Sequence, residues 1–416
     1  MRAAPRERRL FALVLALAAL VRFGAAIALW DRPIHDDERA YDEMAANLVA
    51  GRGFSTARPI GLLNRGFGQP SSLWGCAQPA YVAAVYAVFG RVPGVVYLGN
   101  GLLGLVPVWL AAAWAGRLGG QAALAAAGVI VALDVYLVKF QASLMTETLF
   151  IAALCAGLWH AERWAAGGGA RRAIAAGALF GLATLTRALA FYLAFLVVLW
   201  VLWERRRSRA ELGRGLAGFV LAMALVLAPW VARNLRVHDE PVFLDTKAGW
   251  NLYTTLHPQF EPLANNEVPL PPEVLDPSVS ESRLNRIMLA GARDHLRTDP
   301  GHVLSMAPQK LYLLWSPLPG KLTSPRWAPV KLGFVLPLEL LAAIGAVVLG
   351  TRHREVRLIY VVIGYVCLVH AVMTGGPRFR TPLDPLLAVA AGAALAWLWR
   401  RRRGRQSTST SPSTPA

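Results

Sequence analysis

Three adjacent acids are the first residues in this chain that could do chemistry. Asp36, Asp37 and Glu38 follow the first apolar run after only a few residues. A carboxylate just above a bilayer could act as a general base on an acceptor hydroxyl or amine, given hydrogen-bond reach and a suitable pKa. The structural alternative is that Asp36 or Asp37 caps a helix and Glu38 favours its positive end. Both interpretations stay open at this point.

A further acid lies inside an apolar run. Glu147, in Thr146-Glu147-Thr148, is expected about one turn into the outer end of a fourth span. An ionisable group at that depth is costly, which favours a functional role and a charged partner. Lys139 and Arg187 are the candidate partners, and an ion pair that only holds the bundle together is the alternative. Asp134, in the third predicted span, is a similar but less specific case.

Cations gather at the same predicted face. Arg187, Arg233, Arg378 and Arg380 lie at outer span ends or in short outer links, with Lys139 nearby. The guanidinium fork matches phosphate oxygens, so this group is suited to a phosphate on a lipid. The alternative is that each side chain reaches outer-leaflet phospholipid by itself. The sequence has no Walker motif, no metal-spaced His, Cys or Asp cluster and no glycine-rich dinucleotide loop, so soluble-nucleotide chemistry has no support.

Apolar runs must position these side chains. Of the 416 residues, 55% are apolar and 16% are charged, which argues against a soluble or disordered protein. The formal net charge of +18 would suggest nucleic acid in a soluble protein. Here the arginines cluster between apolar runs, so no nucleic-acid partner is expected. The three cysteines lie far apart, which argues against a disulfide framework.

The apolar runs predict an all-α polytopic membrane protein with about ten spans. The spans are expected at about 10–30, 93–115, 120–138, 144–160, 172–187, 189–203, 214–232, 331–350, 357–373 and 382–399. The run 172–203 is divided into two spans because most Lys- and Arg-rich links then fall on one side, as the positive-inside rule requires. Both termini are then cytoplasmic. The first run exceeds a usual signal-peptide core, which favours an uncleaved anchor.

This topology divides the chain into six parts. They are the cytoplasmic N-terminus with the first span (1–30), a first extracytoplasmic loop (31–92), a bundle of six spans (93–232), a large extracytoplasmic loop (233–330), three C-terminal spans (331–399) and a disordered cytoplasmic tail (400–416). Both loops should carry juxtamembrane helices. One is expected near 78–90, a second follows the capping residues Ser278 and Glu281, and a third, at about 302–315, should place Lys310 at the membrane surface.

Six motifs, in this order, resemble those of the GT-C membrane glycosyltransferases. They are Asp37-Glu38-x-x-Tyr41 leading to Gly53-Phe54, Gln78-Pro79-x-Tyr81, Thr146-Glu147-x-Leu149-Phe150, Leu185-Thr186-Arg187, Pro229-Trp230-x-x-Arg233-Asn234 and Arg378-Phe379-Arg380-x-Pro382. The branch that they resemble most contains the bacterial relatives of protein O-mannosyltransferases and of the aminoarabinose transferase that modifies lipid A. The similarity extends over about residues 10–399.

The resemblance implies an enzyme of the bacterial plasma membrane with a GT-C-like bundle. It would pass a sugar from a polyprenyl-phosphate carrier to a lipid, glycan or protein acceptor on the extracytoplasmic side. The family's acid in the first outer loop matches Asp37, with Asp36 and Glu38 alongside, and its acid after the third span matches Glu147. Asp37 would take the acceptor proton during an inverting attack, while the cations stabilise the departing phosphate.

Other expectations concern substrate contacts, metals and the competing class of protein. Tyr41 and Asn234, which lie in the motifs, are expected to position the substrate. No metal is required, although the acidic loop could hold a divalent ion. A transporter or flippase of a lipid-linked sugar could also use arginines and an intramembrane carboxylate. The sequence has no internal hydropathy repeat of the kind that many transporters show, which favours the transferase.

Overall fold

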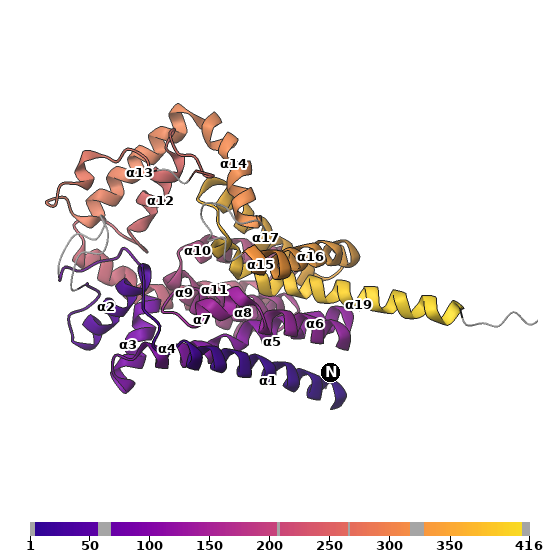
Figure 1. The fold of residues 1–416 in the computed structure, drawn as a ribbon. Coiled ribbons are helices and arrows are strands. Elements are labelled where there is room, and N and C mark those ends of the chain that lie inside the picture. The colour runs from indigo at the N-terminus through magenta and orange to yellow at the C-terminus, as the bar shows by residue number, and fades with distance from the viewer. Residues whose placement is uncertain (1–4, 57–67, 206–208, 265–266, 317–327, 410–416) are drawn as a thin grey trace, which may run out of the picture.

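The computed structural model describes residues 5–56, 68–205, 209–264, 267–316 and 328–409. Within these ranges the regular structure is helical and there is no strand, so the all-α prediction is confirmed. Long helices run side by side, with the N-terminus and the end of α19 at one end of the bundle (Figure 1). The helices α2 and α13 lie at the opposite end, which we call the loop end.

Helices of the bundle coincide with the predicted spans, either singly or as broken pairs. They are α1 (Pro5–Ala28), α4 (Pro93–Leu103), α5 (Leu105–Gly119), α6 (Gln121–Ala132), α7 (Val135–Gln141), α8 (Glu147–Ala165), α9 (Gly169–Thr186), α10 (Leu189–Glu204), α11 (Arg209–Val237), α16 (Leu336–Leu349), α17 (Arg354–Val372) and α19 (Asp384–Ser409). In the described ranges, six helical segments are long and apolar enough to cross a membrane, and the pair α6 and α7, bent by 48°, makes a seventh. The protein is therefore a multi-pass membrane protein, and the count of ten spans stays a prediction. Helix α19 continues through the start of the predicted tail, whose residues 410–416 lie outside the described ranges.

Shorter helices form the loop end or extend the ends of bundle helices. They are α2 (Asp37–Val49), α3 (Ala77–Phe89), α12 (Lys247–Leu256), η1 (Pro272–Val274), α13 (Glu281–Thr298), α14 (Pro300–Trp315), α15 (Ala328–Val330), η3 (Lys331–Val335), α18 (Pro377–Arg380) and η4 (Thr381–Leu383). The capping residue of α13 is Ser280, which accepts a hydrogen bond from the Arg283 N–H, and not the predicted Ser278. Leu284 and Met288 of this helix are buried against Tyr253 of α12.

Small residues allow the bundle helices to approach closely. A Cβ atom on Gly177 of α9 would lie 2.1 Å from the Phe219 carbonyl oxygen of α11. Likewise, a Cβ on Gly345 of α16 would lie 1.9 Å from the Ala390 carbonyl oxygen of α19. Backbone contact through glycine is a common way to pack helices in membranes, where apolar side chains alone provide little drive for association.

Two helix boundaries carry functional candidates. Arg187 has φ −148° and ψ 119° between α9 and α10, which confirms that the run 172–203 is a pair of helices. Glu147 is the first residue of α8, so it lies at the helix start and not one turn inside it, as the sequence suggested. At such a start the free backbone N–H groups favour an anion.

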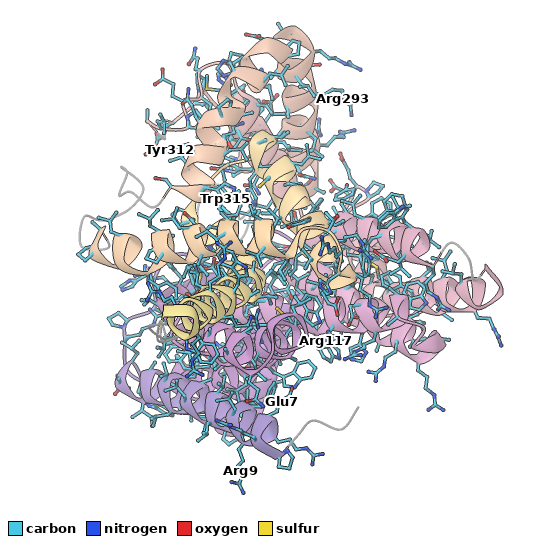
Figure 2. The ribbon with its side chains drawn as sticks, turned by 90° about the vertical axis from the view of Figure 1, so that its right-hand side faces the viewer. Glu7, Arg9, Arg117, Arg293, Tyr312 and Trp315 are labelled. Carbon is cyan, nitrogen blue, oxygen red and sulfur yellow. The ribbon has the colours of Figure 1, made fainter. Side chains whose placement is uncertain are left out.

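Charged side chains also gather at the end of the bundle where the termini lie. Figure 2, which views this end, labels Glu7, Arg9 and Arg117 there. The buried Glu162 of α8 pairs at 3.2 Å with both Arg117 and Arg354. This network joins α5, α8 and α17 far from the loop end.

Candidate active site

The predicted acidic loop begins helix α2, but its three acids have different environments. Asp36 is exposed and occupies the N-cap position with φ 48°, and its side chain makes no capping hydrogen bond. Glu38 is buried and forms an ion pair with Arg32. It also accepts a 2.8 Å hydrogen bond from the Leu144 N–H, which ties α2 to the segment before α8. Asp37 therefore lies between an exposed acid and an acid with a structural role.

Asp37 faces cations. Its Oδ2 atom lies 3.6 Å from Nη1 of Arg378, and its Oδ1 atom lies 3.7 Å from Nζ of Lys247. The indole N–H of Trp74 donates to Oδ1 at 3.4 Å. Burial alone would raise the pKa of Asp37, but Lys247 and Arg378 outweigh it and hold the pKa below its ordinary value. Asp37 is thus a carboxylate at neutral pH.

Glu147 shares the cation Arg378 with Asp37. The side chain is fully buried and pairs with Nε of Arg378 and, at 2.7 Å, with Nη2 of Arg187. Arg187 also donates through Nε to the hydroxyl of Thr146 at 2.9 Å. Of the two predicted partners of Glu147, the structure brings Arg187 into an ion pair. Lys139 is exposed, with its ammonium 5.8 Å from the centre of the Phe140 ring.

The cluster has more positive than negative groups. Three cations (Arg187, Arg378 and Lys247) surround two carboxylates (Asp37 and Glu147), which leaves one positive charge in excess. About a third of the Arg378 and Lys247 side chains is exposed, whereas Glu147 has no exposed surface. The excess charge is therefore partly open to the surroundings, where an anion could reach it.

Tyr41 lies one turn after Asp37 on α2 and is buried. Burial, reinforced by the charge of Asp37, raises the pKa of its phenol. Tyr41 therefore stays a neutral hydroxyl beside the charged cluster, and its role in positioning a substrate stays a prediction.

Arg233 and Asn234 belong to a neighbouring network on α11. The guanidinium of Arg233 donates to the Ser72 hydroxyl at 2.6 Å and lies 4.8 Å from the Trp230 ring centre. The Ser72 hydroxyl donates in turn to Oδ1 of Asn234 at 2.8 Å. Glu281 of α13 accepts hydrogen bonds from Ser71 and from the Ser72 N–H, so these contacts join the two loops.

Arg380 lies apart from Arg378. Its nearly inaccessible side chain pairs with Glu339 of α16 at 2.7 Å and with Asp384 of α19 at 3.4 Å. Asp134, the second intramembrane acid of the sequence analysis, caps α7 by accepting hydrogen bonds from the Tyr136 and Leu137 N–H groups. The structure thus places Arg380 in a buried network within the bundle.

Two residues of the cluster, Lys247 and Trp74, were not predicted from the sequence. Lys247 is the first residue of α12, and Trp74 lies in the segment before α3. Trp74 lies in an irregular stretch and Lys247 at a helix boundary, so no apolar periodicity relates either residue to Asp37. Only the folding of the two loops over α2 brings them there. A lysine at the start of a helix, where a cation is disfavoured, was the one local signal.

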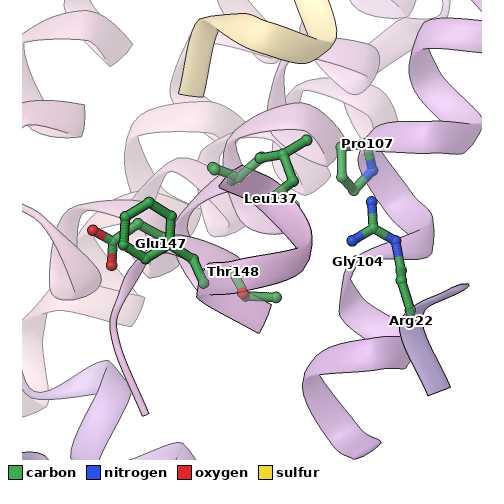
Figure 3. Close-up of a pocket in the computed structure, with 8 residues that line it drawn as sticks. Arg22, Gly104, Pro107, Leu137, Glu147 and Thr148 are labelled. Atoms are coloured by element: carbon green, nitrogen blue, oxygen red, sulfur yellow. The ribbon is translucent and has the colours of Figure 1, made fainter. Parts of the chain in front are cut away.

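A small cavity of about 10 Å³, room for about one water molecule, borders the cluster from inside the bundle (Figure 3). Arg22 and Gly104 lie on one side of it, and Glu147 and Thr148 lie on the other. The remaining lining residues are mostly apolar, among them Leu137 and Pro107. The buried face of the site therefore adjoins room for little more than one water molecule between the helices.

No metal-binding group is evident in the part of the chain that the structure describes. Within it, three or more His, Cys, Asp or Glu side chains nowhere come together as ligands for an ion. A divalent ion at the acidic loop stays an untested prediction.

Comparisons with known proteins agree with this architecture. Residues 78–232 match the family model of the dolichyl-phosphate-mannose-protein mannosyltransferases. The fold matches the oligosaccharyltransferase AglB from Archaeoglobus fulgidus, solved with an inhibitory peptide and a dolichol-phosphate, at 11% identity and a TM-score of 0.58. That match covers 99% of this chain and 52% of AglB, so the chain spans about half the length of that protein.

A second solved structure is ArnT from Cupriavidus metallidurans bound to undecaprenyl phosphate, with 16% identity and a TM-score of 0.46 over 97% of this chain and 81% of ArnT. No curated protein sequence matches the chain significantly. The family match and the fold confirm the resemblance to the GT-C membrane glycosyltransferases.

Proposed function

We propose that this protein is an integral-membrane glycosyltransferase that moves a sugar from a polyprenyl-phosphate donor to a lipid, glycan or protein acceptor. The observation that supports this most directly is the cluster in which Arg378 lies between Asp37 and Glu147. The mannosyltransferase family match over residues 78–232 supports the same class of reaction.

The cations suit the leaving group. A polyprenyl phosphate departs as an anion, so its departure needs positive charge and not a proton donor. Arg378 and Lys247 are partly exposed, and Arg187 supports the buried Glu147. Arg233 and Lys139 could extend the positive field. Arg380 is left out of this role because acids enclose its guanidinium.

Asp37 suits the role of general base. The acceptor O–H or N–H proton goes to Asp37, the acceptor atom bonds to the anomeric carbon, and the bond from that carbon to the phosphate oxygen breaks. A single displacement of this kind inverts the anomeric centre. A donor phosphate paired with Arg378 would also remove part of the field that lowers the pKa of Asp37. Donor binding would thereby make Asp37 a stronger base.

The proposed location is the bacterial plasma membrane, with the loop end on the extracytoplasmic face and both termini in the cytoplasm. The basic residues near both chain ends, among them Arg9 and Arg400, support this orientation through the positive-inside rule.

The proposal can be tested with purified protein in detergent and a panel of synthetic polyprenyl-phosphate sugars. Release of polyprenyl phosphate in the presence of an envelope extract as acceptor is the expected result, and Asp37→Asn should release far less. Proteoliposomes carrying the same donors provide the contrasting measurement. Movement of intact donor across the bilayer without release would overturn the proposal and favour a transporter.

A further inference from the structure

Lys310 of α14 is buried, although the sequence analysis expected it at the membrane surface. Its ammonium donates to the Thr255 carbonyl oxygen at 2.9 Å and to the Val372 carbonyl oxygen at 2.6 Å. Thr255 is in the last turn of α12, and Val372 is the last residue of α17. These oxygens are among the carbonyls that a helix end leaves without a partner, and a cation is favoured there.

Among the described residues, the contacts of this ammonium are the two carbonyls and the Phe260 ring, whose centre is 5.8 Å away. Burial lowers the pKa of Lys310 to about 8, since no acid offsets the loss of water. A buried charge without an acid partner is costly. An apolar residue would fill the same space at a lower free-energy cost. The presence of a lysine here therefore needs an explanation, and the two helix ends that its ammonium joins suggest one.

The linker that follows Val372 leads directly to Arg378. A Cβ atom on Gly375 would lie 2.1 Å from the carbonyl oxygen of Lys310, so the linker backbone rests against α14 at this glycine. Lys310 therefore contacts the chain on both sides of the start of the linker, with its side chain at Val372, the last residue of α17, and its backbone at Gly375 in the linker. Arg378 follows Gly375 by three residues.

The other side of the linker is held by α17. The His370 ring lies 4.9 Å from the Phe379 ring, and its Nδ1 atom is 2.7 Å from the Thr374 carbonyl oxygen. The linker thus lies between α17 and α14. Because it contacts both helices, the position of α14 affects where the guanidinium of Arg378 lies.

We propose that Lys310 is a positioning residue that couples the α12–α14 segment to Arg378, so that the placement of this segment sets the geometry of the reaction. The expected effect on turnover rests on the proposed transferase function. The contact between Lys310 and the linker can be measured separately. A displacement of about 1 Å at a reacting group can cost about a hundredfold in rate.

The first measurement is hydrogen exchange of the linker in full-length protein. Lys310→Met keeps an unbranched side chain one atom shorter and removes the donors, and Gly375→Ala separates the linker from α14 without changing the lysine. Both variants should speed amide exchange in peptides that cover 373–379. Arg293→Met is the matched control, because Arg293 is an exposed cation on the neighbouring α13, as Figure 2 shows. Unchanged exchange in both folded test variants overturns the proposal.

The second measurement is turnover of a polyprenyl-phosphate sugar, at equal amounts of folded protein. Both test variants should lose about ten- to a hundredfold, and Arg293→Met should keep wild-type turnover. In an Arg378→Ala background, Lys310→Met should lower the residual rate by less than about twofold, because the two residues act through one group. The coupling is overturned if Lys310→Met lowers the rate as much in the Arg378→Ala background as it does in the wild-type protein. It is also overturned if the test variants keep wild-type turnover although their linker exchanges faster. A wild-type protein that is inactive with every donor contradicts the proposed function instead, and the exchange result then still decides the contact.

Discussion

Asp37 and Glu147 lie on two sides of one guanidinium group, that of Arg378. The two acids are not equivalent, because Glu147 keeps Arg187 at 2.7 Å if Arg378 turns to another anion. The second cation of Asp37 is Lys247, which is more distant, at 3.7 Å. An arriving phosphate therefore draws charge away from Asp37 more than from Glu147, which links donor binding to the basicity of the proposed base.

The first prediction concerns Asp37. Asp37→Asn keeps the shape of the side chain but cannot accept a proton, so turnover should fall by about 10² to 10⁴ while donor binding changes little. Steady-state rates and donor binding measured on the same preparation check this. Comparable turnover in Asp37→Asn and wild type would rule out Asp37 as the base.

Amide substitutions at the neighbouring acids provide the controls. Asp36→Asn should keep activity, because the Asp36 side chain is exposed and makes no capping hydrogen bond. Glu38→Gln should lower stability, because it removes a charge that pairs with Arg32.

Arg378 and Arg380 should respond differently to removal. Arg378→Ala should reduce kcat/KM for the donor by about 10² to 10³, since it removes a cation at the developing phosphate charge. Arg378→Lys should restore only part of it, because lysine lacks the bidentate fork. A kcat/KM within twofold of wild type in Arg378→Ala would exclude the arginine from donor binding.

Arg380→Ala should instead affect folding. Its removal leaves Glu339 and Asp384 without their shared cation in the bundle interior, and breaking a buried pair of this kind costs about 3–5 kcal/mol. Thermal unfolding in detergent should show a lower midpoint and a lower yield. A stable but inactive Arg380→Ala protein would return Arg380 to the active site.

The contrast between these two arginines shows what the sequence could and could not predict. The spans followed from the length of the apolar runs and the spacing of arginines, which are local properties of the chain. Residues two apart on a helical turn point in different directions, so Arg378 and Arg380 could not both face one ligand. Both were nevertheless assigned to the phosphate, because both lie in one short outer link of the predicted topology. The spacing already implied different directions for the two side chains, but their common place in the predicted topology was given more weight.

Long-range contacts were beyond the sequence. Lys247 and Trp74 reach Asp37 from separate loops, and no periodic pattern places loop residues relative to one another. The apolar pattern of α14 indicated an amphipathic helix at the membrane surface, but the structure shows that other helices cover the face that carries Lys310. A hydrophobic pattern identifies a helix more readily than it identifies the partner of each face.

The pH dependence of the free enzyme should reflect the lowered pKa of Asp37. Lys247 and Arg378 hold this pKa below its ordinary value of 3.8, so the proposed base stays ionised down to a lower pH. The acidic limb of kcat/KM should therefore lie below about pH 4. The contribution of Asp37 to stability has the same sign, because it is present above the unfolded pKa and is lost as the pH falls through the folded pKa.

Substitution of Lys247 provides the check on that limb. Lys247→Met should move the acidic limb of kcat/KM to higher pH, because it removes the first of the charges that lower the pKa of Asp37. The limb would be measured between about pH 3 and pH 7 with donor below its KM. An identical limb in wild type and Lys247→Met would assign the titration to a group other than Asp37.

The last prediction concerns the orientation in the membrane. Ser278 is exposed near α13 at the loop end, and Thr351 is exposed between α16 and α17 beside the end of the bundle that holds the termini. Single cysteines at these two positions, in a protein whose Cys76, Cys155 and Cys367 are replaced, should react differently with a membrane-impermeant maleimide on intact cells. If basic links stay in the cytoplasm, position 278 is labelled and position 351 is labelled only after lysis. Labelling of position 351 in intact cells would reverse the orientation, and the donor would then have to reach Arg378 from the cytoplasmic leaflet.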